Sequence, residues 1–238
     1  MSSIQQNIEQ ITSQIKSAQQ KCGRSPSSVQ LLAVSKTKPV EAILEAALAG
    51  QLAFGENYVQ EGVNKIRYFA EHHPQLDLEW HFIGPLQSNK TRLIAEHFDW
   101  MHTVDRAKIA QRLSEQRPAH KAPLQVLIQV NTSGETSKSG ISDQALFPLA
   151  ELISELPNLT LRGLMSIPEN VADYAEQLVA FQRLADLQAR LTERYPALDT
   201  LSMGMSGDMQ AAIEAGSTMV RIGTAIFGQR DYPTSTKP

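Results

Sequence analysis

The chain of 238 residues contains a single cysteine, Cys22, which excludes an internal disulfide bond and is typical of a reducing compartment. No apolar run approaches the roughly 20 residues of a membrane helix, and residues 1–10 lack the basic and apolar regions of a signal peptide. The net charge of -3 gives no reason to expect nucleic acid or an anionic membrane as a partner. These absences predict a cytoplasmic, soluble protein, and the 42% of hydrophobic residues predict a globular core.

The sequence does contain a repeated pattern, in which a short apolar run is followed by an amphipathic helical stretch. Eight such units follow a leading helix over residues 1–22, whose isoleucines recur at spacings of four and three. This α/β pattern predicts a single (β/α)8 TIM barrel, and a doubly wound open sheet is the alternative. The predicted strands cover residues 31–35, 52–55, 80–84, 100–104, 124–130, 161–167, 200–203 and 219–222.

The domain organisation follows from the absence of any linker rich in proline, glycine and serine. We therefore expect one domain over residues 1–238, and we expect it to be a monomer. Residues 229–238 hold two prolines and few apolar side chains, which predicts a weakly packed tail. Residues 134–140 form a polar loop that either covers the barrel mouth, contacts a partner or is simply solvated.

Lys36 directly follows the first predicted strand, and in a TIM barrel the active site lies at the carboxyl ends of the strands. A lysine that is partly desolvated there has a lowered amine pKa and becomes a neutral nucleophile able to form an imine. The alternative is a solvated loop lysine, which is also how we interpret Lys38. Taken alone, Lys36 does not decide between these two interpretations.

The loops after the seventh and eighth strands are rich in glycine and hydroxyl groups, at residues 202–207 (SMGMSG) and 221–224 (RIGT). Loops at these two positions form the usual phosphate site of the fold, because glycines allow close backbone approach and free N–H groups attract an anion. Ordinary turns are the alternative. A nucleophilic lysine and an anion cradle together suit an aldehyde that bears a phosphate.

Segments along nearly the whole chain resemble the pyridoxal phosphate homeostasis protein family. They are residues 33–38 (AVSKTK), 54–57 (FGEN), 81–84 (HFIG), 86–90 (LQSNK), 163–167 (GLMSI), 201–206 (LSMGMS) and 220–228 (VRIGTAIFG). The resemblance implies a barrel like the N-terminal domain of alanine racemase, without the second domain of the racemases. It also implies pyridoxal 5′-phosphate as the cofactor and no established catalysis.

Residue roles come with this resemblance. It implies that Lys36 carries the cofactor as an imine and that Asn57 lies beside it. The resemblance also implies that Ser206, Gly223 and Thr224 hold the phosphate and that Ser202 assists them.

Arg221 bears on whether the protein is an enzyme. An arginine that faces the pyridine nitrogen only donates, so it keeps that nitrogen unprotonated and the ring a weak electron sink. The alternative is a surface arginine in an ion pair. With the ring contact, the consistent interpretation is cofactor binding without rapid turnover, and therefore no enzyme.

Three functions follow as hypotheses. The first is a cofactor carrier that regulates pyridoxal phosphate homeostasis (vitamin B6 supply) by buffering the cofactor and delivering it to pyridoxal phosphate-dependent apoenzymes. The second is a small pyridoxal phosphate-dependent amino-acid racemase or decarboxylase. The third is a Schiff-base aldolase, which lacks an evident carboxylate beside the lysine. The histidines form no metal motif, and His81 either lines the pocket or is structural.

Overall fold

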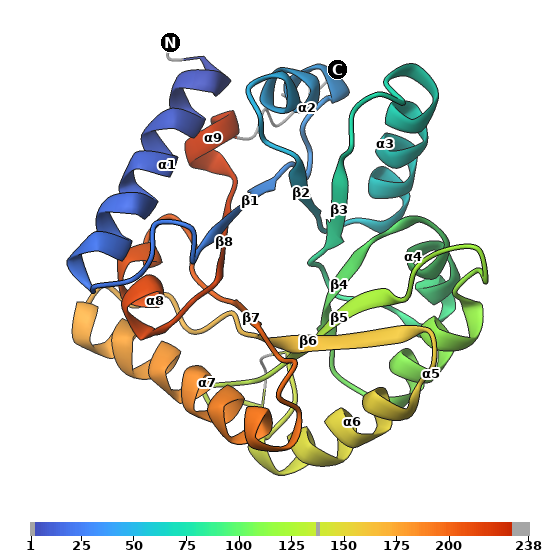
Figure 1. Cartoon of the computed structure of the whole chain (residues 1–238), viewed down its shortest axis with the longest axis vertical. Helices are drawn as coiled ribbons and strands as arrows, with labels where there is room; N and C mark the ends of the chain where they lie inside the picture. The colour runs from blue at the N-terminus through green and yellow to red at the C-terminus, as the bar shows by residue number, and fades with distance from the viewer. Residues whose placement is uncertain (1–2, 137–138, 230–238) are drawn as a thin grey trace, which may run out of the picture.

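The computed structural model describes residues 3–136 and 139–229, and within them eight parallel strands close into a barrel (Figure 1). The strands pair in chain order, and β1 pairs with β8 to complete the ring. They are β1 (Gln30–Val34), β2 (Ala53–Glu56), β3 (Glu79–Phe82), β4 (Trp100–Val104), β5 (Leu124–Gln129), β6 (Leu159–Met165), β7 (Thr200–Ser202) and β8 (Met219–Ile222). The predicted (β/α)8 barrel is confirmed, and the open sheet is wrong.

Helices surround the barrel on the outside, as Figure 1 shows. They are α1 (Ile4–Lys21), α2 (Val40–Leu48), α3 (Val59–His72), α4 (Thr91–His97), α5 (Ala107–Gln116), α6 (Asp143–Glu155), α7 (Tyr174–Arg194) and α8 (Met209–Ala215). Two short helical segments were not predicted, the 3-10 helix η1 (Ser88–Lys90) and α9 (Thr224–Phe227). Among the residues that the structure describes, no helix combines the length and apolarity needed to cross a membrane.

The leading helix α1 covers the outside of the barrel near its closure. Its apolar stripe of Ile8, Ile11 and Ile15 is buried, and the helix packs on α2, α8 and α9. The side chain of Ser3 accepts a hydrogen bond from the Gln6 N–H, while the Ser3 N–H donates to the side-chain oxygen of Gln6, and this capping box fixes the start of the helix. The leading helix predicted from the isoleucine spacing is confirmed.

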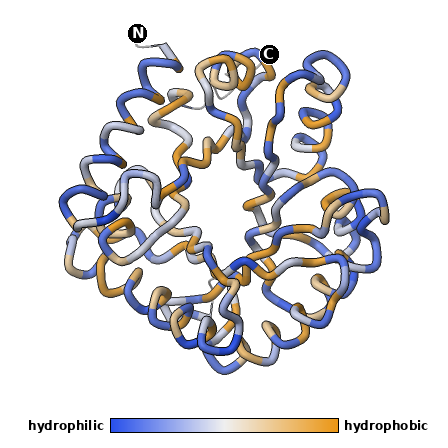
Figure 2. The backbone as a smooth tube through the Cα atoms, in the orientation of Figure 1, coloured by the Kyte–Doolittle hydropathy of each residue, from blue (hydrophilic) through white to orange (hydrophobic). Residues whose placement is uncertain are grey.

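The apolar core lies mainly between the strands and the helices, where the outward-facing residues of the strands meet the helix stripes. Hydrophobic residues recur along both the strands and the helices around them (Figure 2). Inside the barrel the apolar groups are fewer. One cluster joins Leu32, Ala53, Ile83 and Met219, and another joins Trp100, Leu127 and Met165. The remaining interior includes buried polar side chains, so the barrel is a filled core with a polar centre.

The 230–238 part of the predicted tail lies outside the described residues, and so do positions 137 and 138 of the polar loop. Gln229 is exposed, and its carbonyl accepts a hydrogen bond from the Lys38 ammonium at 2.8 Å.

Candidate functional site

Lys36 lies at the carboxyl end of β1, and its position follows from strand alternation. Leu32 and Val34 belong to the apolar cluster inside the barrel, so Lys36, two residues further on, is directed to the same side. Val34 is in register with Gly55 of β2, and Lys36 and Asn57 each follow two residues later. The two predicted residues therefore lie side by side at the barrel mouth, where both are half-buried.

The residue before Lys36 faces the opposite way and is anchored by a buried cluster of charges, which we call the Lys65 cluster: Ser35, Glu56, Glu61 and Lys65. The Lys65 ammonium donates to the Ser35 carbonyl at 2.7 Å and to the carboxylates of Glu56 and Glu61 at 2.8 and 2.7 Å. The Ser35 hydroxyl donates to Glu56 at 2.6 Å. Burial raises the pKa of Glu56, and the nearby Lys65 ammonium opposes this rise.

The residue after Lys36 is held by the same cluster. Thr37 has a φ of 63°, and it is the one non-glycine residue with positive φ in the described chain. Its N–H donates to the Glu61 carboxylate at 2.6 Å. A β-branched residue in this conformation is strained, and such strain collects at functional sites where the surroundings enforce it. Lys36 is thus fixed on both sides by one cluster.

The loops after β7 and β8 meet beside β1 and form the predicted anion cradle. The Arg221 N–H donates to the Gly204 carbonyl at 2.9 Å, which ties the two loops together. A Cβ at Gly223 would lie 3.2 Å from the Val34 carbonyl oxygen, so the chain approaches β1 closely there. In these two loops, the backbone N–H groups of Ser206, Gly207, Gly223 and Thr224 are among those that donate no hydrogen bond within the described residues. Free N–H groups in adjoining loops are suited to an anion.

Asp208 limits the cradle in one respect. Its carboxylate accepts from the Met205 N–H at 2.6 Å, so this donor is taken from within the loop. Burial raises the pKa of Asp208, and the positive charge of Arg221 opposes the rise. Ser206 and Thr224 are both exposed, and Ser206 also lines a cavity of about 350 Å³ beside α1 and α7. In the described part of the structure, no side-chain hydrogen bond joins Ser206 or Thr224 to the other predicted residues.

Arg221 is buried inside the barrel, so its interpretation as a surface arginine in an ion pair is wrong. It donates to the Ser202 hydroxyl at 2.8 Å and to the Ser166 carbonyl at 3.0 Å. Burial lowers the pKa of Arg221 to about 10, which still leaves it charged at neutral pH. The structure brings Arg221 and Ser202 into direct contact. Arg221 is in register with Leu32 of β1, so this contact lies deeper in the barrel than Lys36.

Near the barrel mouth, two buried polar atoms find no hydrogen-bond partner among the residues that the structure describes, the amide oxygen of Asn57 and the hydroxyl of Ser166. Orphaned buried polar atoms in a native fold call for a partner. Each residue directly follows a strand, β2 for Asn57 and β6 for Ser166, with Lys36 beside Asn57 and Arg221 beside Ser166. A polar ligand that bears an anion, a ring nitrogen and an aldehyde fits this set of residues.

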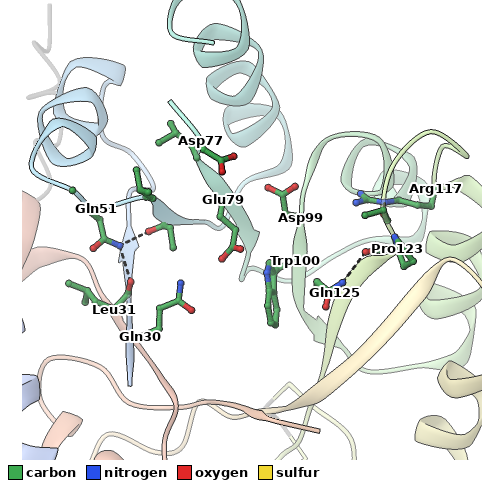
Figure 3. Close-up of a pocket in the computed structure, with 15 residues that line it drawn as sticks. Gln30, Leu31, Gln51, Asp77, Glu79, Asp99, Trp100, Arg117, Pro123 and Gln125 are labelled. Atoms are coloured by element: carbon green, nitrogen blue, oxygen red, sulfur yellow. Dashed lines mark hydrogen bonds between the residues drawn. The ribbon is translucent and has the colours of Figure 1, made fainter. Parts of the chain in front are cut away.

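The mouth also contains a cavity of about 520 Å³ on the side away from the cradle. Asn57 and Ile83 line it together with residues of the loops after β4, β5 and β6, including Arg106 and Glu169. A larger cavity of about 600 Å³ lies at the opposite, amino end of the strands (Figure 3). Active sites of this fold lie at the carboxyl ends, so the mouth is the candidate site and the amino-end cavity is not.

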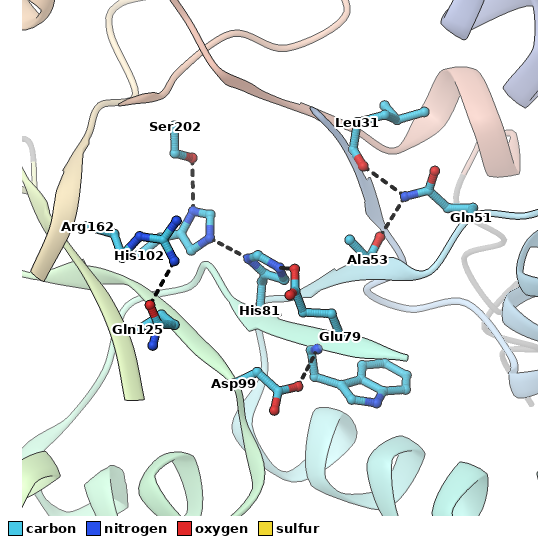
Figure 4. A network of polar contacts seen from close by, with 11 residues as sticks. Leu31, Gln51, Ala53, Glu79, His81, Asp99, His102, Gln125, Arg162 and Ser202 are labelled. Atoms are coloured by element: carbon cyan, nitrogen blue, oxygen red, sulfur yellow. Dashed lines mark hydrogen bonds and ion pairs between the residues drawn. The ribbon is translucent and has the colours of Figure 1, made fainter. Parts of the chain in front are cut away.

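Sequence reasoning assigned no role to Ser166 and missed Glu56 and Lys65. It left His81 open and did not connect it with His102. In the structure these two histidines are fully buried and hydrogen bonded to each other inside the barrel, at 2.8 Å (Figure 4). Polar residues at alternate positions of a buried strand, as in Glu79 and His81, were the available signal, because alternate side chains share one face.

Comparison with known proteins gives consistent results. The family described as "Alanine racemase, N-terminal domain" matches residues 6–231. The pyridoxal phosphate homeostasis protein of Vibrio cholerae is 82% identical over 98% of both chains, and that of Escherichia coli K12 is 60% identical over 98% of this chain and 99% of its own.

Solved structures agree in fold. PipY of Synechococcus elongatus, solved with PLP bound, is 37% identical with a TM-score of 0.82, and the match covers 95% of this chain and 100% of PipY. Alanine racemase of Clostridium difficile has a TM-score of 0.74 at 13% identity, covering 98% of this chain and 58% of the racemase, a likeness of fold alone. The chain belongs to the pyridoxal phosphate homeostasis protein family, whose barrel is that of the alanine racemase N-terminal domain.

Proposed function

We propose that this protein binds pyridoxal 5′-phosphate through Lys36 and regulates its supply in the cell by buffering it and delivering it to apoenzymes. The observation that carries the proposal is the placement of Lys36 between Asn57 and the loops with free N–H groups. An aldehyde held by Lys36 and a phosphate held by the loops after β7 and β8 fit that span of the barrel mouth. The relatives that bear the homeostasis name match almost the full chain.

The covalent step requires only Lys36. Lys36 would hold the cofactor through its amine, which in the neutral form could condense with the aldehyde and release one water molecule. The Lys65 cluster holds the backbone on both sides of Lys36, which limits the conformations of the loop that presents the amine. When bound, the cofactor supplies an electron-withdrawing ring, and its strength depends on the ring nitrogen.

In our proposal, Arg221 is the residue that sets the protonation state of the ring nitrogen. A guanidinium only donates hydrogen bonds, so a ring nitrogen that accepts from Arg221 carries no proton of its own. A ring in this state withdraws electrons weakly, which suits binding and release more than turnover. A carrier is therefore favoured over an amino-acid racemase or decarboxylase.

The proposal is tested by the visible spectrum of the purified protein before and after borohydride reduction. We expect a yellow protein and, after reduction, a phosphopyridoxyl group on Lys36 in the peptide map. Lys36→Ala should fold and remain colourless, while Lys38→Ala serves as the matched control and should keep the label. A label on another lysine in the wild type would contradict the assignment of Lys36.

Delivery needs its own measurement. Mixing the loaded protein with a pyridoxal phosphate-dependent apoenzyme should restore the activity of that apoenzyme, and Lys36→Ala treated with cofactor and desalted should not. The loaded protein should leave the full set of amino acids unchanged. Sustained racemisation or decarboxylation that Lys36→Ala abolishes would replace the carrier by an enzyme.

The cradle is tested separately from Lys36. Thr224→Ala and Ser206→Ala should each weaken binding of pyridoxal phosphate by about 1–3 kcal/mol if their hydroxyls donate to the phosphate. Pyridoxal without phosphate should be insensitive to both changes. Equal losses for the two ligands would place these exposed hydroxyls away from the phosphate.

A further inference from the structure

A continuous row of hydrogen-bonded side chains crosses the barrel interior, and Figure 4 shows it from Glu79 to Ser202. We call it the transbarrel chain, and its members are Glu79, His81, His102, Ser202 and Arg221. The links measure 2.7 Å from Glu79 to His81, 2.8 Å between the histidines, 2.9 Å from His102 to Ser202 and 2.8 Å from Ser202 to Arg221. The function proposed above uses only its last member.

The transbarrel chain runs from the amino end of the barrel toward its carboxyl end, because its members lie progressively further along their strands. Glu79 is the first residue of β3 and lines the amino-end cavity, where its side chain is 42% exposed. Ser202 is the last residue of β7, next to the cradle loop. His81, His102, Ser202 and Arg221 are all buried. The polar row therefore begins in contact with solvent and ends at the candidate cofactor site.

The two ends of the chain determine the direction of every hydrogen bond within it. Arg221 can only donate, so the Ser202 hydroxyl oxygen accepts from it. An ionised Glu79 can only accept, so the Nε2 of His81 carries a proton and donates to it. Because burial lowers the pKa of both histidines, each is neutral and has one N–H.

The remaining protons then have one consistent arrangement. With its proton on Nε2, His81 accepts at Nδ1 from the Nε2–H of His102. His102 in turn accepts at Nδ1, and the donor to it is the hydroxyl of Ser202. The reverse order would direct a lone pair of His81 at the Glu79 carboxylate, which is repulsive. Each proton therefore points toward the amino end of the barrel.

The surroundings hold this arrangement. Trp100 stacks on His81 with ring centroids 5.1 Å apart and an interplanar angle of 13°. Trp100 in turn lies under the Arg162 guanidinium at 4.8 Å. These rings separate the central links from the water of the amino-end cavity, so the hydrogen bonds of the two histidines persist in a region of low dielectric.

We infer that Glu79, His81 and His102 are positioning residues, which draw the Ser202 proton toward His102 and so leave the Arg221 guanidinium as the donor that faces the cofactor ring. A serine with a free hydroxyl proton beside Arg221 would be a second donor to the ring nitrogen. The chain removes it from that role by giving it an acceptor on the far side. This inference rests on the proposed binding of pyridoxal phosphate.

The test uses the full-length protein loaded with pyridoxal phosphate that carries ¹⁵N in the ring, observed by NMR at one neutral pH. In His102→Phe the Ser202 hydroxyl loses its acceptor and becomes a competing donor, so the ring ¹⁵N resonance should move by more than its linewidth. His102→Gln offers an acceptor and a donor at nearly the same spacing as imidazole, so it should restore the wild-type position. His97→Phe, a half-buried histidine outside the chain, is the matched control and should change nothing.

A second variant guards against misfolding of His102→Phe. Glu79→Leu changes a partly exposed side chain and should fold, yet it removes the acceptor that fixes His81, so the resonance should shift in the same direction. Lys36 and the cradle are untouched in both variants, so the dissociation constant should stay within about threefold of the wild type. A merely structural role would move the dissociation constant and leave the resonance in place.

Two results would overturn the inference, and they have different meanings. An unchanged ring resonance in both His102→Phe and Glu79→Leu, with the cofactor still bound, would show that the chain does not act on the ring while the proposed function stands. Absence of bound label in the wild type would remove the proposed function, and this inference with it.

Discussion

The protein contains two buried polar assemblies, and each offsets the cost of removing polar groups from water in a different way. The Lys65 cluster lies between the strands and α3 and is charged, with one ammonium between two carboxylates. The transbarrel chain lies inside the barrel, and its buried middle is neutral, with two imidazoles and a hydroxyl. Burying a charge costs far more than burying a neutral hydrogen-bonded group, so the two assemblies should respond differently to the same disturbance.

Their positions explain the difference. The Lys65 cluster holds a backbone, because its ammonium and carboxylates bind the Ser35 carbonyl and the Thr37 N–H on either side of Lys36. Strong charge-assisted bonds suit a strained loop that must not move. The transbarrel chain holds proton positions, which neutral donors and acceptors in series define. One assembly fixes the backbone beside Lys36, and in our proposal the other determines which donor the ring nitrogen of the cofactor meets.

The largest expected effect comes from breaking the charged assembly. Lys65→Met leaves the Glu56 carboxylate buried without its cation, and removing one partner of a buried pair costs about 3–5 kcal/mol of unfolding free energy. Urea unfolding followed by circular dichroism measures this loss. We also expect weaker cofactor binding, because the Ser35 carbonyl loses its donor.

The double variant Lys65→Met with Glu56→Gln is the control for this prediction. It removes the uncompensated charge and should recover a substantial part of the stability that Lys65→Met loses. The exposed pair of Arg194 and Glu151, 54% and 51% exposed, gives the opposite reference, and Arg194→Ala should cost at most about 1 kcal/mol. A Lys65→Met loss as small as this one would mean that the cluster is effectively solvated.

The next effect is the dependence of stability on pH, which should have opposite signs in the two assemblies. Burial lowers the pKa of His81 and His102 from 6.5, so below that value the unfolded chain binds more protons than the folded one. Their contribution to stability is therefore complete above about pH 6.5 and declines as the pH falls, by up to about 1.4 kcal/mol per pH unit for each histidine. The charged groups that face them are Glu79, Asp99 and Arg221.

Glu56 behaves in the reverse way. Its pKa is raised by burial, so the folded chain binds its proton more readily, and this contribution is present below pH 4.5 and lost as the pH rises through the folded pKa. His102→Gln should flatten the decline of stability as the pH falls from 6.5 toward 4.5, whereas Glu56→Gln removes a group that gains stability in the same direction and should steepen the decline. Urea unfolding at intervals over this range checks both, and parallel slopes in the two variants would contradict the contrast.

The fold was predictable from the sequence because each strand and helix has its own periodicity. The fourth and eighth strands were predicted with the observed bounds, and the isoleucine spacing of α1 matched its buried stripe. The sixth strand was predicted two residues late at both ends, over 161–167 in place of Leu159–Met165, and its end was missed because the apolar run continues to Ile167. Helix α9 has only four residues, too few for a periodic pattern.

The candidate site was only partly predictable, for a physical reason. A lysine or a glycine-rich loop at the end of a strand is visible in one segment, so Lys36 and the cradle loops could be named. Lys65 and Glu56 are nine residues apart, and His102 and Ser202 are one hundred apart, yet each pair is in contact. Neither segment of such a pair shows the contact alone, since one contact arises when α3 packs on β2 and the other when β4 and β7 face each other across the closed barrel.

The smallest effect concerns the strain that the charged assembly maintains at Thr37. Its φ of 63° costs a β-branched residue on the order of 1–2 kcal/mol, and glycine adopts the same conformation without that cost. Glycine also gives the unfolded chain more freedom, which opposes the gain by about 0.4–1 kcal/mol. Thr37→Gly should therefore stabilise the fold by up to about 1 kcal/mol in urea unfolding, the reverse of the effect that Lys65→Met has. Thr37→Ala, which keeps the Cβ and most of the strain, should leave stability nearly unchanged.

If the strain serves to hold Lys36 in place, the more stable Thr37→Gly protein should bind pyridoxal phosphate more weakly than Thr37→Ala does. Tighter binding by Thr37→Gly would show that the strained loop hinders the cofactor and that the Lys65 cluster serves stability alone.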